Sequence, residues 1–274
     1  MENKNENLSL SHKREQDGHF LDNSTNMKLL FLGTGTSTGI PQIGCNCRVC
    51  ASTEKKDKRL RASVLISEGN TRILIDCGPD LRQQLIKHEI YHLSAILLTH
   101  EHYDHVGGLD DVRPLGEAQL YAEKKVLGVI QRNMPYCFVE KKYPGVPLIQ
   151  LHEIKEEPFK IEELNIQPIR VLHERLPILG YRFGKIAYLT DVKTIEDKSI
   201  DQLKGLDILV INALRPIKHI SHLSLDEAIE IATIIGAKET YFTHMSHDIG
   251  LHYEVDQLLP KNIHLSYDGL ELSL

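Results

Sequence analysis

The stretch LLTHEHYDHVGG, residues 97–108, limits the possible folds of this chain most strongly, because a dense set of metal-ligand side chains follows one apolar strand. The run SAILLTH before it is continuously apolar, which predicts a buried strand. Four potential ligands then come within six residues: His100, His102, Asp104 and His105. In an extended segment residues i and i+2 point to the same side, so we expect His100 and His102 to bind one cation. Asp104 and His105 follow a turn and are expected to face a second cation.

Three later strands deliver the same kinds of side chain at their ends. IRVLH ends in His173, AYLTD ends in Asp191, and YFTH ends in His244, with His247 three residues further on. Loops at the ends of strands commonly carry chemistry on a rigid scaffold. The spacing therefore predicts a two-metal site assembled from several strand ends.

Short β runs and helices alternate after residue 27, which indicates an α/β protein. The stretch 63–78 is typical of a hairpin that turns at Glu68-Gly-Asn70. The clearest helix is SLDEAIEIATIIGA, because Ser224 and Glu227 can form a capping box. Two more helices are expected in DLRQQLIKHEI and AEKKVLGVIQRN. We predict one domain over residues 27–274 and a polar, disordered extension over residues 1–26.

Composition excludes several classes of function. No apolar run approaches the roughly 20 residues that a membrane span needs, and the polar N-terminal residues lack the apolar core of a secretion signal. We therefore expect a cytoplasmic protein without a membrane partner. The net charge of −6 disfavours binding of long nucleic acids, which usually requires a basic face.

The stretch GTGTSTGIPQIGCNCRVC carries two further signals. Its glycines are typical of a phosphate-binding loop, but the Lys-Ser/Thr pair of a P-loop is missing, so we expect these glycines to serve a tight turn. Three cysteines follow within six residues: Cys45, Cys47 and Cys50. Three thiolates and a fourth ligand are a usual set for structural zinc.

The ligand order HxHxDH, followed by His173, Asp191 and His244, resembles that of the metallo-β-lactamase superfamily of binuclear hydrolases. The resemblance extends to FLGTGTS and to ILIDCGPD with Asp76. It implies a metallo-β-lactamase αββα four-layer sandwich with two divalent metals at one edge of the sheets. His100, His102 and His173 would hold the first metal, Asp104, His105 and His244 the second, and Asp191 would bridge both. Asp76 would orient a ligand histidine from behind.

Within the superfamily, the cysteine stretch and THMSHD resemble the PhnP-type cyclic-phosphate phosphodiesterases. That resemblance implies a structural zinc held by Cys45, Cys47, Cys50 and His247. It also implies hydrolysis of small phosphate diesters such as 5-phosphoribosyl 1,2-cyclic phosphate by a hydroxide that bridges the metals, and it suggests a homodimer. Zinc and manganese both suit the His and Asp ligands. His222, at the entry to the capped helix, matches the accessory histidine of such phosphodiesterases and is expected to serve the leaving oxygen, together with Asp104 and Asp191 as catalytic residues.

Three alternatives remain from the sequence. A transfer-RNA 3′-processing ribonuclease shares FLGTGTS and HxHxDH, but it carries a substrate-gripping arm for which the interval from His173 to Asp191 has no room. A thioesterase or lactonase would leave the cysteine stretch unexplained. A non-enzymatic zinc-binding protein would need one closed set of ligands, whereas this chain has seven further candidates.

Overall fold

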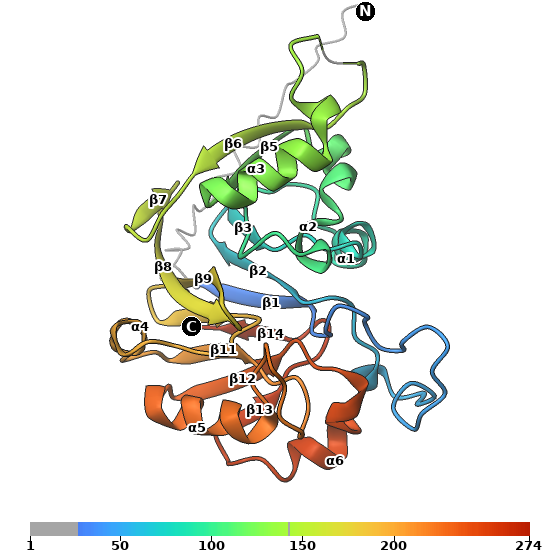
Figure 1. Ribbon diagram of the computed structural model, residues 1–274, viewed down its shortest axis with the longest axis vertical. Coiled ribbons are helices and arrows are strands. Elements are labelled where there is room, and N and C mark those ends of the chain that lie inside the picture. Colours follow the sequence, from blue (N-terminus) through green and yellow to red (C-terminus); the bar gives the residue numbers. More distant parts are fainter. Residues whose placement is uncertain (1–26, 142) are drawn as a thin grey trace, which may run out of the picture.

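The computed structural model describes residues 27–141 and 143–274, in which the strands form two seven-stranded sheets (Figure 1). The first sheet has the order β14-β1-β2-β3-β4-β5-β6. Its strands are β1 (Lys28–Gly33), β2 (Ser63–Glu68), β3 (Thr71–Ile75), β4 (Ala95–Leu97), β5 (Glu117–Ala122), β6 (Leu148–Glu153) and β14 (Glu271–Ser273). The predicted N-terminal extension, residues 1–26, lies outside the described residues.

The second sheet has the order β13-β12-β11-β10-β9-β8-β7. Its strands are β7 (Phe159–Ile161), β8 (Leu164–His173), β9 (Leu176–Phe183), β10 (Ile186–Leu189), β11 (Ile208–Asn212), β12 (Glu239–Thr243) and β13 (Ile263–Leu265). The helices are α1 (Leu81–Lys87), α2 (Tyr103–Val106), α3 (Lys124–Asn133), α4 (Asp197–Gln202), α5 (Leu225–Ile235) and α6 (His252–Asp256). Short 3₁₀ turns are η1 (Lys55–Asp57), η2 (Leu109–Leu115), η3 (Pro135–Cys137) and η4 (His247–Ile249).

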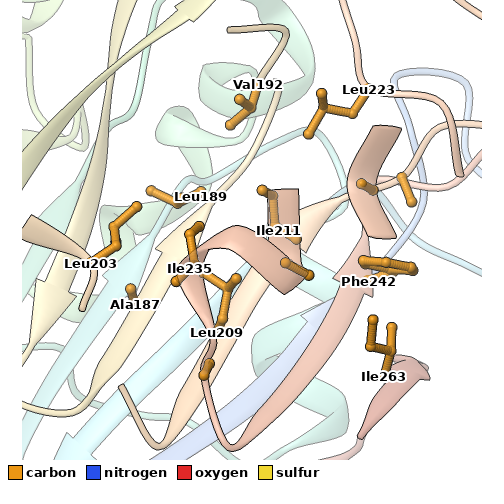
Figure 2. Close-up of a cluster of buried hydrophobic side chains, with 14 of the residues drawn as sticks. Ala187, Leu189, Val192, Leu203, Leu209, Ile211, Leu223, Ile235, Phe242 and Ile263 are labelled. Carbon is orange, nitrogen blue, oxygen red and sulfur yellow. The ribbon is translucent and has the colours of Figure 1, made fainter. Parts of the chain in front are cut away.

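Alternation along the strands separates the apolar side chains into three buried layers. In β3, Ile73 and Ile75 belong to the cluster that includes Tyr181 and Tyr188 of the second sheet, whereas Leu74 belongs to the cluster under α1 and α3. A third cluster lies between the second sheet and α5, where Figure 2 shows Leu209 and Ile211 beside Ile235 and Phe242. The protein is thus a four-layer αββα sandwich, as the resemblance implied. Each fully buried Leu or Ile contributes roughly 1.5–3 kcal/mol to this core.

Two local predictions agree with the structure. Ser224 accepts a hydrogen bond from the backbone N–H of Glu227, whose side chain accepts from the backbone N–H of Ser224, so the capping box of α5 is present. The helix ends at Gly236, whose φ of 71° a glycine adopts without steric cost. Strands β2 and β3 form the predicted hairpin, with Glu68 paired to Thr71.

Residues 263–274 do not form one continuous strand. The segment divides into β13, which pairs with β12 in the second sheet, and β14, which pairs with β1 in the first. Gly269, with φ 98°, lies in the turn between them and breaks the extended run. Strands β5 and β6 were not predicted, because both are short and carry few of the β-branched residues that are typical of strands. None of the helices in the described part of the chain is long and apolar enough to cross a membrane.

Candidate metal centre

The residues predicted as ligands of the two catalytic metals meet at one edge of the two sheets, at the end of β8 or in the segments that follow β4, β10 and β12. Three site residues there have a left-handed backbone, with φ 61° at Asp76, 55° at Asp191 and 55° at His244. This conformation costs non-glycine residues on the order of 1 kcal/mol each and is concentrated at functional sites. Asp76 and His244 directly follow β3 and β12, and Asp191 lies two residues after the end of β10, so a sharp turn aims each side chain across the sheet edge.

The first group of ligands is all imidazole. The ring nitrogens of His100, His102 and His173 lie within 4.8 Å of one another. His100 Nε2 is 2.9 Å from His102 Nδ1, as expected for residues i and i+2 in an extended segment. Burial lowers the pKa of His100 well below its usual value, which keeps the imidazole in the neutral form that binds metals. His173 donates from Nδ1 to the carbonyl oxygen of Ser221 at 2.8 Å, which leaves Nε2 for a ligand.

The second group combines a carboxylate with two imidazoles, Asp104, His105 and His244. Asp104 Oδ2 lies 3.2 Å from His105 Nε2 and 3.5 Å from His244 Nε2. The turn that brings Asp104 and His105 here depends on close backbone packing. A Cβ on Gly78 would lie 2.0 Å from the carbonyl oxygen of Asp104, and one on Gly108 would lie 2.2 Å from that of Gly78.

Asp191 lies between the two groups, in the position expected of a bridging ligand. Its Oδ2 is 3.1 Å from His105 Nε2, and its Oδ1 is 3.2 Å from His244 Nε2. Asp191 also forms possible ligand sets with His100 and His105, and with His173 and His222. Although burial acts to raise it, the pKa of Asp191 is held well below its usual value, chiefly by His244 and His105. The carboxylate is therefore ionised and faces both groups.

Asp76 orients one histidine of each ligand group, either directly or through Thr99. Its Oδ2 accepts from His105 Nδ1 at 2.7 Å. It also accepts from the backbone N–H and hydroxyl of Thr99, and that hydroxyl lies 2.9 Å from His100 Nδ1. One fully buried carboxylate thus orients a histidine of each group, which extends the predicted role of Asp76.

The arrangement fits a pair of divalent cations. Nε2 of both His105 and His244 is buried without a hydrogen-bond partner among the described residues, although carboxylate oxygens lie 3.1–3.5 Å away. Two ligands about 2.1 Å from one tetrahedral metal lie roughly 3.4 Å apart, so these spacings suit shared coordination. Burial opposes protonation of His105, yet the carboxylates of Asp191, Asp104 and Asp76 raise its pKa well above the usual value. Two buried carboxylates and the half-buried Asp104 therefore favour positive charge at this edge.

The cysteine stretch forms a separate group of ligands. Nδ1 of His247 lies 3.3 Å from Cys45 Sγ, 3.5 Å from Cys47 Sγ and 3.4 Å from Cys50 Sγ. These distances match those between thiolate and imidazole ligands of tetrahedral zinc, about 3.5 Å. A hydrogen bond from the backbone N–H of Cys50 lowers the pKa of Cys47 to about 6, which favours the thiolate that binds zinc.

The segment before α5, which contains His219 and His222, also lies at the metal centre. His222 Nε2 lies 2.9 Å from Asp191 Oδ1, so the predicted accessory histidine is beside the bridging position. The Ser221 hydroxyl lies 3.0 Å from His222 Nδ1 and 3.2 Å from His219 Nδ1. His219 thus belongs to a chain of side chains behind His222. The sequence offered no signal for Thr99 or Ser221, because their roles depend on contacts formed only in the folded chain.

Comparison with known proteins agrees with this geometry. The model of the β-lactamase superfamily domain matches residues 71–245, a range that contains Asp76 and every residue of the two ligand groups. The chain belongs to this superfamily. The superfamily match begins after the cysteine stretch and ends before His247, so it does not include the cysteine group.

Individual relatives refine the assignment. A crystal structure described as a new diphosphatase from the PhnP family is 41% identical, with a TM-score of 0.86, and the match covers 91% of this chain and 97% of that one. The chain is therefore a superfamily hydrolase of the PhnP type. Zinc-bound PqqB from Methylobacterium extorquens shares the fold, with a TM-score of 0.75 at 20% identity over 90% of this chain and 100% of that one.

A curated relative, the octanoyltransferase of Porphyromonas gingivalis, is 48% identical over 251 residues, which are 89% of this chain. The chain spans about half the length of that relative, 51%. The name of the relative applies to a protein with a second, unmatched half.

Proposed function

We propose that this hydrolase is a binuclear metal-dependent phosphodiesterase that acts on small, cyclic phosphate diesters such as 5-phosphoribosyl 1,2-cyclic phosphate. The observation that carries the proposal is the position of Asp191 between two ligand groups, one of three imidazoles and one of a carboxylate and two imidazoles. Likeness to a PhnP-family diphosphatase over most of both chains supports phosphorus rather than carbon as the centre of attack.

When bound, two divalent cations in such groups supply Lewis acidity at the phosphoryl oxygens and lower the pKa of water, and either zinc or manganese suits the ligands. Side chains of the protein would bind and orient these cations. His100, His102 and His173 would hold one cation, Asp104, His105 and His244 would hold the other, and Asp191 would contribute a carboxylate between the two groups. Asp76 accepts a hydrogen bond from His105 Nδ1 and so favours the tautomer of His105 whose Nε2 is free to bind a metal.

His222 stabilises the leaving oxygen in this proposal. Burial lowers the pKa of His222 to about 4, against the opposing hydrogen bond with Asp191. Below that pKa the ring is charged, and near pH 7 it is neutral. A neutral imidazole has a single N–H to donate, and Nε2 lies 2.9 Å from Asp191 Oδ1, so in this proposal the leaving oxygen takes over that hydrogen bond from Asp191.

The chain lacks the arm expected of a transfer-RNA processing ribonuclease between His173 and Asp191. Strands β9 and β10 and their short turns fill this interval. A thioester hydrolase is the second candidate, because a relative named for octanoyl transfer shares most of this chain. Because that relative has a second half that the chain does not match, its name does not assign octanoyl transfer to this chain.

A substrate panel distinguishes these candidates. The metal-loaded chain is expected to show its highest kcat/KM on 5-phosphoribosyl 1,2-cyclic phosphate, a lower value on 2′,3′-cyclic nucleotides, and the lowest on an octanoyl thioester. Steady-state kinetics with all three at one pH and one metal concentration provide the measurement. A thioester value above both diester values would assign the site to acyl chemistry instead.

A further inference from the structure

We propose that Arg61 forms a second phosphate subsite at the edge of the metal centre, where it binds a phosphate group of the substrate that is not cleaved. This inference rests on the proposed function and names a substrate class within it. Such substrates carry two separate phosphates, one at the metals and one at this guanidinium.

The backbone places Arg61 beside the metal ligands. A Cβ on Gly78 would lie 2.0 Å from the carbonyl oxygen of Asp104 and 3.4 Å from Cβ of Arg61, so the stem of Arg61 borders the turn that holds Asp104. Gly35 forms bridges to both Arg61 and Met245, the residue after His244. Two strand spacings of about 4.8 Å put the backbone of Arg61 roughly 10 Å from that of Met245.

Hydrogen bonds from Nη1 and Nε hold the guanidinium in one orientation and leave Nη2 available to a ligand. Its Nη1 donates to Asp80 Oδ1 at 3.0 Å and Oδ2 at 3.2 Å, and its Nε donates to the carbonyl oxygen of Ser37 at 3.1 Å. Nη2 has no hydrogen-bond partner among the residues that the structure describes, and the side chain is 29% exposed. A fixed arginine with free donors loses little conformational entropy when it binds a ligand.

Asp80 orients the Arg61 side chain but does not occupy all of the N–H donors of the guanidinium. The Asp80 side chain is 9% exposed, and its oxygens also accept from the backbone N–H of Arg61 at 2.8 Å and from Gln83 Nε2 at 3.1 Å. The negative charge of Asp80 is therefore shared among three donors. Phosphate oxygens are well suited to the remaining N–H groups, because the planar guanidinium presents donors in a geometry that matches them.

The alternative is a purely structural Arg61 that ties the glycine loop to α1. A structural role would lower the melting temperature and the turnover of every substrate together. A phosphate subsite would instead change the preference between substrates with and without the second phosphate, mainly through KM.

The test compares 5-phosphoribosyl 1,2-cyclic phosphate with ribosyl 1,2-cyclic phosphate, which lacks the 5-phosphate. The wild-type chain is expected to favour the phosphorylated substrate by about 10- to 100-fold in kcat/KM, the range for hydrogen bonds to a charged group. Arg61→Gln is expected to bring this ratio close to one by raising KM for the phosphorylated substrate. Arg61→Lys should retain part of the preference, because it keeps the charge but loses the fork of donors.

Arg132→Gln, which changes an exposed arginine of α3, is the matched control and should keep the wild-type ratio. Equal wild-type values for the two substrates, or an unchanged ratio in Arg61→Gln, would overturn the subsite while leaving the phosphodiesterase proposal intact. If Arg61→Gln does not fold, the ratio of kcat/KM for the two substrates, measured in the wild-type chain and in Arg61→Lys, tests the subsite. Hydrolysis of neither cyclic phosphate by the wild-type chain would overturn both proposals.

Discussion

Asp104→Ala is expected to lower kcat/KM on bis(p-nitrophenyl) phosphate by about 100- to 1,000-fold and to remove one catalytic cation per chain. Asp104 is the carboxylate of the second ligand group, and its Oδ2 lies within 3.5 Å of both His105 and His244. Without it, two imidazoles and the shared Asp191 remain, a set that has lost its only unshared carboxylate and is expected to bind the second cation much more weakly. Elemental analysis and initial rates on the same sample provide the measurement.

His222→Ala is the matched comparison for this variant. It removes a side chain that lies 2.9 Å from Asp191 but is assigned to the leaving oxygen. We expect His222→Ala to keep the wild-type metal content and to lose about 100-fold in kcat. Full activity of Asp104→Ala would refute the metal assignment, and loss of a cation from His222→Ala would make His222 a ligand instead.

Cys47→Ser is expected to lose about one zinc per chain and to destabilise the fold by about 4 kcal/mol, because structural zinc contributes folding free energy directly. The cysteine group connects the stretch after the first strand to His247, which follows the ligand His244 by three residues. Losing that connection frees the glycine loop beside the metal centre. Metal analysis and urea-induced unfolding measure the two effects.

Asn46→Ser is the control for Cys47→Ser, since Asn46 is exposed between two of the cysteines and offers no sulfur ligand. It should retain both the zinc and the stability of the wild-type chain. The same metal content in Cys47→Ser and in wild type would show that the cysteines bind no zinc.

The grouping of the candidate ligands was predictable because it follows a local rule. His100 and His102 share one side of an extended segment, and His173, Asp191 and His244 each end or follow an apolar strand. The cysteine spacing is equally local. These patterns persist in the sequence because coordination chemistry restricts both residue type and spacing.

The supporting contacts were not predictable, because they join residues that only the folded chain brings together. Thr99 connects Asp76 to His100, and the carbonyl oxygen of Ser221 orients His173 across 48 positions. Any hydroxyl or backbone carbonyl has the chemistry for such a role, so neither residue type nor spacing identifies it. Arg61 is a similar case. Nothing in the basic stretch 55–61 identifies the partner of Arg61, which the structure shows to be the nearly buried Asp80.

The two strands at the end of the chain show the same limit for the fold. The two halves of residues 263–274 have similar β propensity, yet β13 belongs to the second sheet and β14 to the first. Local propensity cannot distinguish these destinations, because partner strands β12 and β1 lie far apart in sequence.

The most direct test of the account is a metal titration of the wild-type chain. The protein is stripped with a chelator, and zinc or manganese is then added while bound metal and turnover of bis(p-nitrophenyl) phosphate are followed together. We predict no turnover without metal, filling of the cysteine group by one zinc, and full activity after two further cations per chain. Full turnover by the metal-free protein, or none with three cations bound, would contradict it.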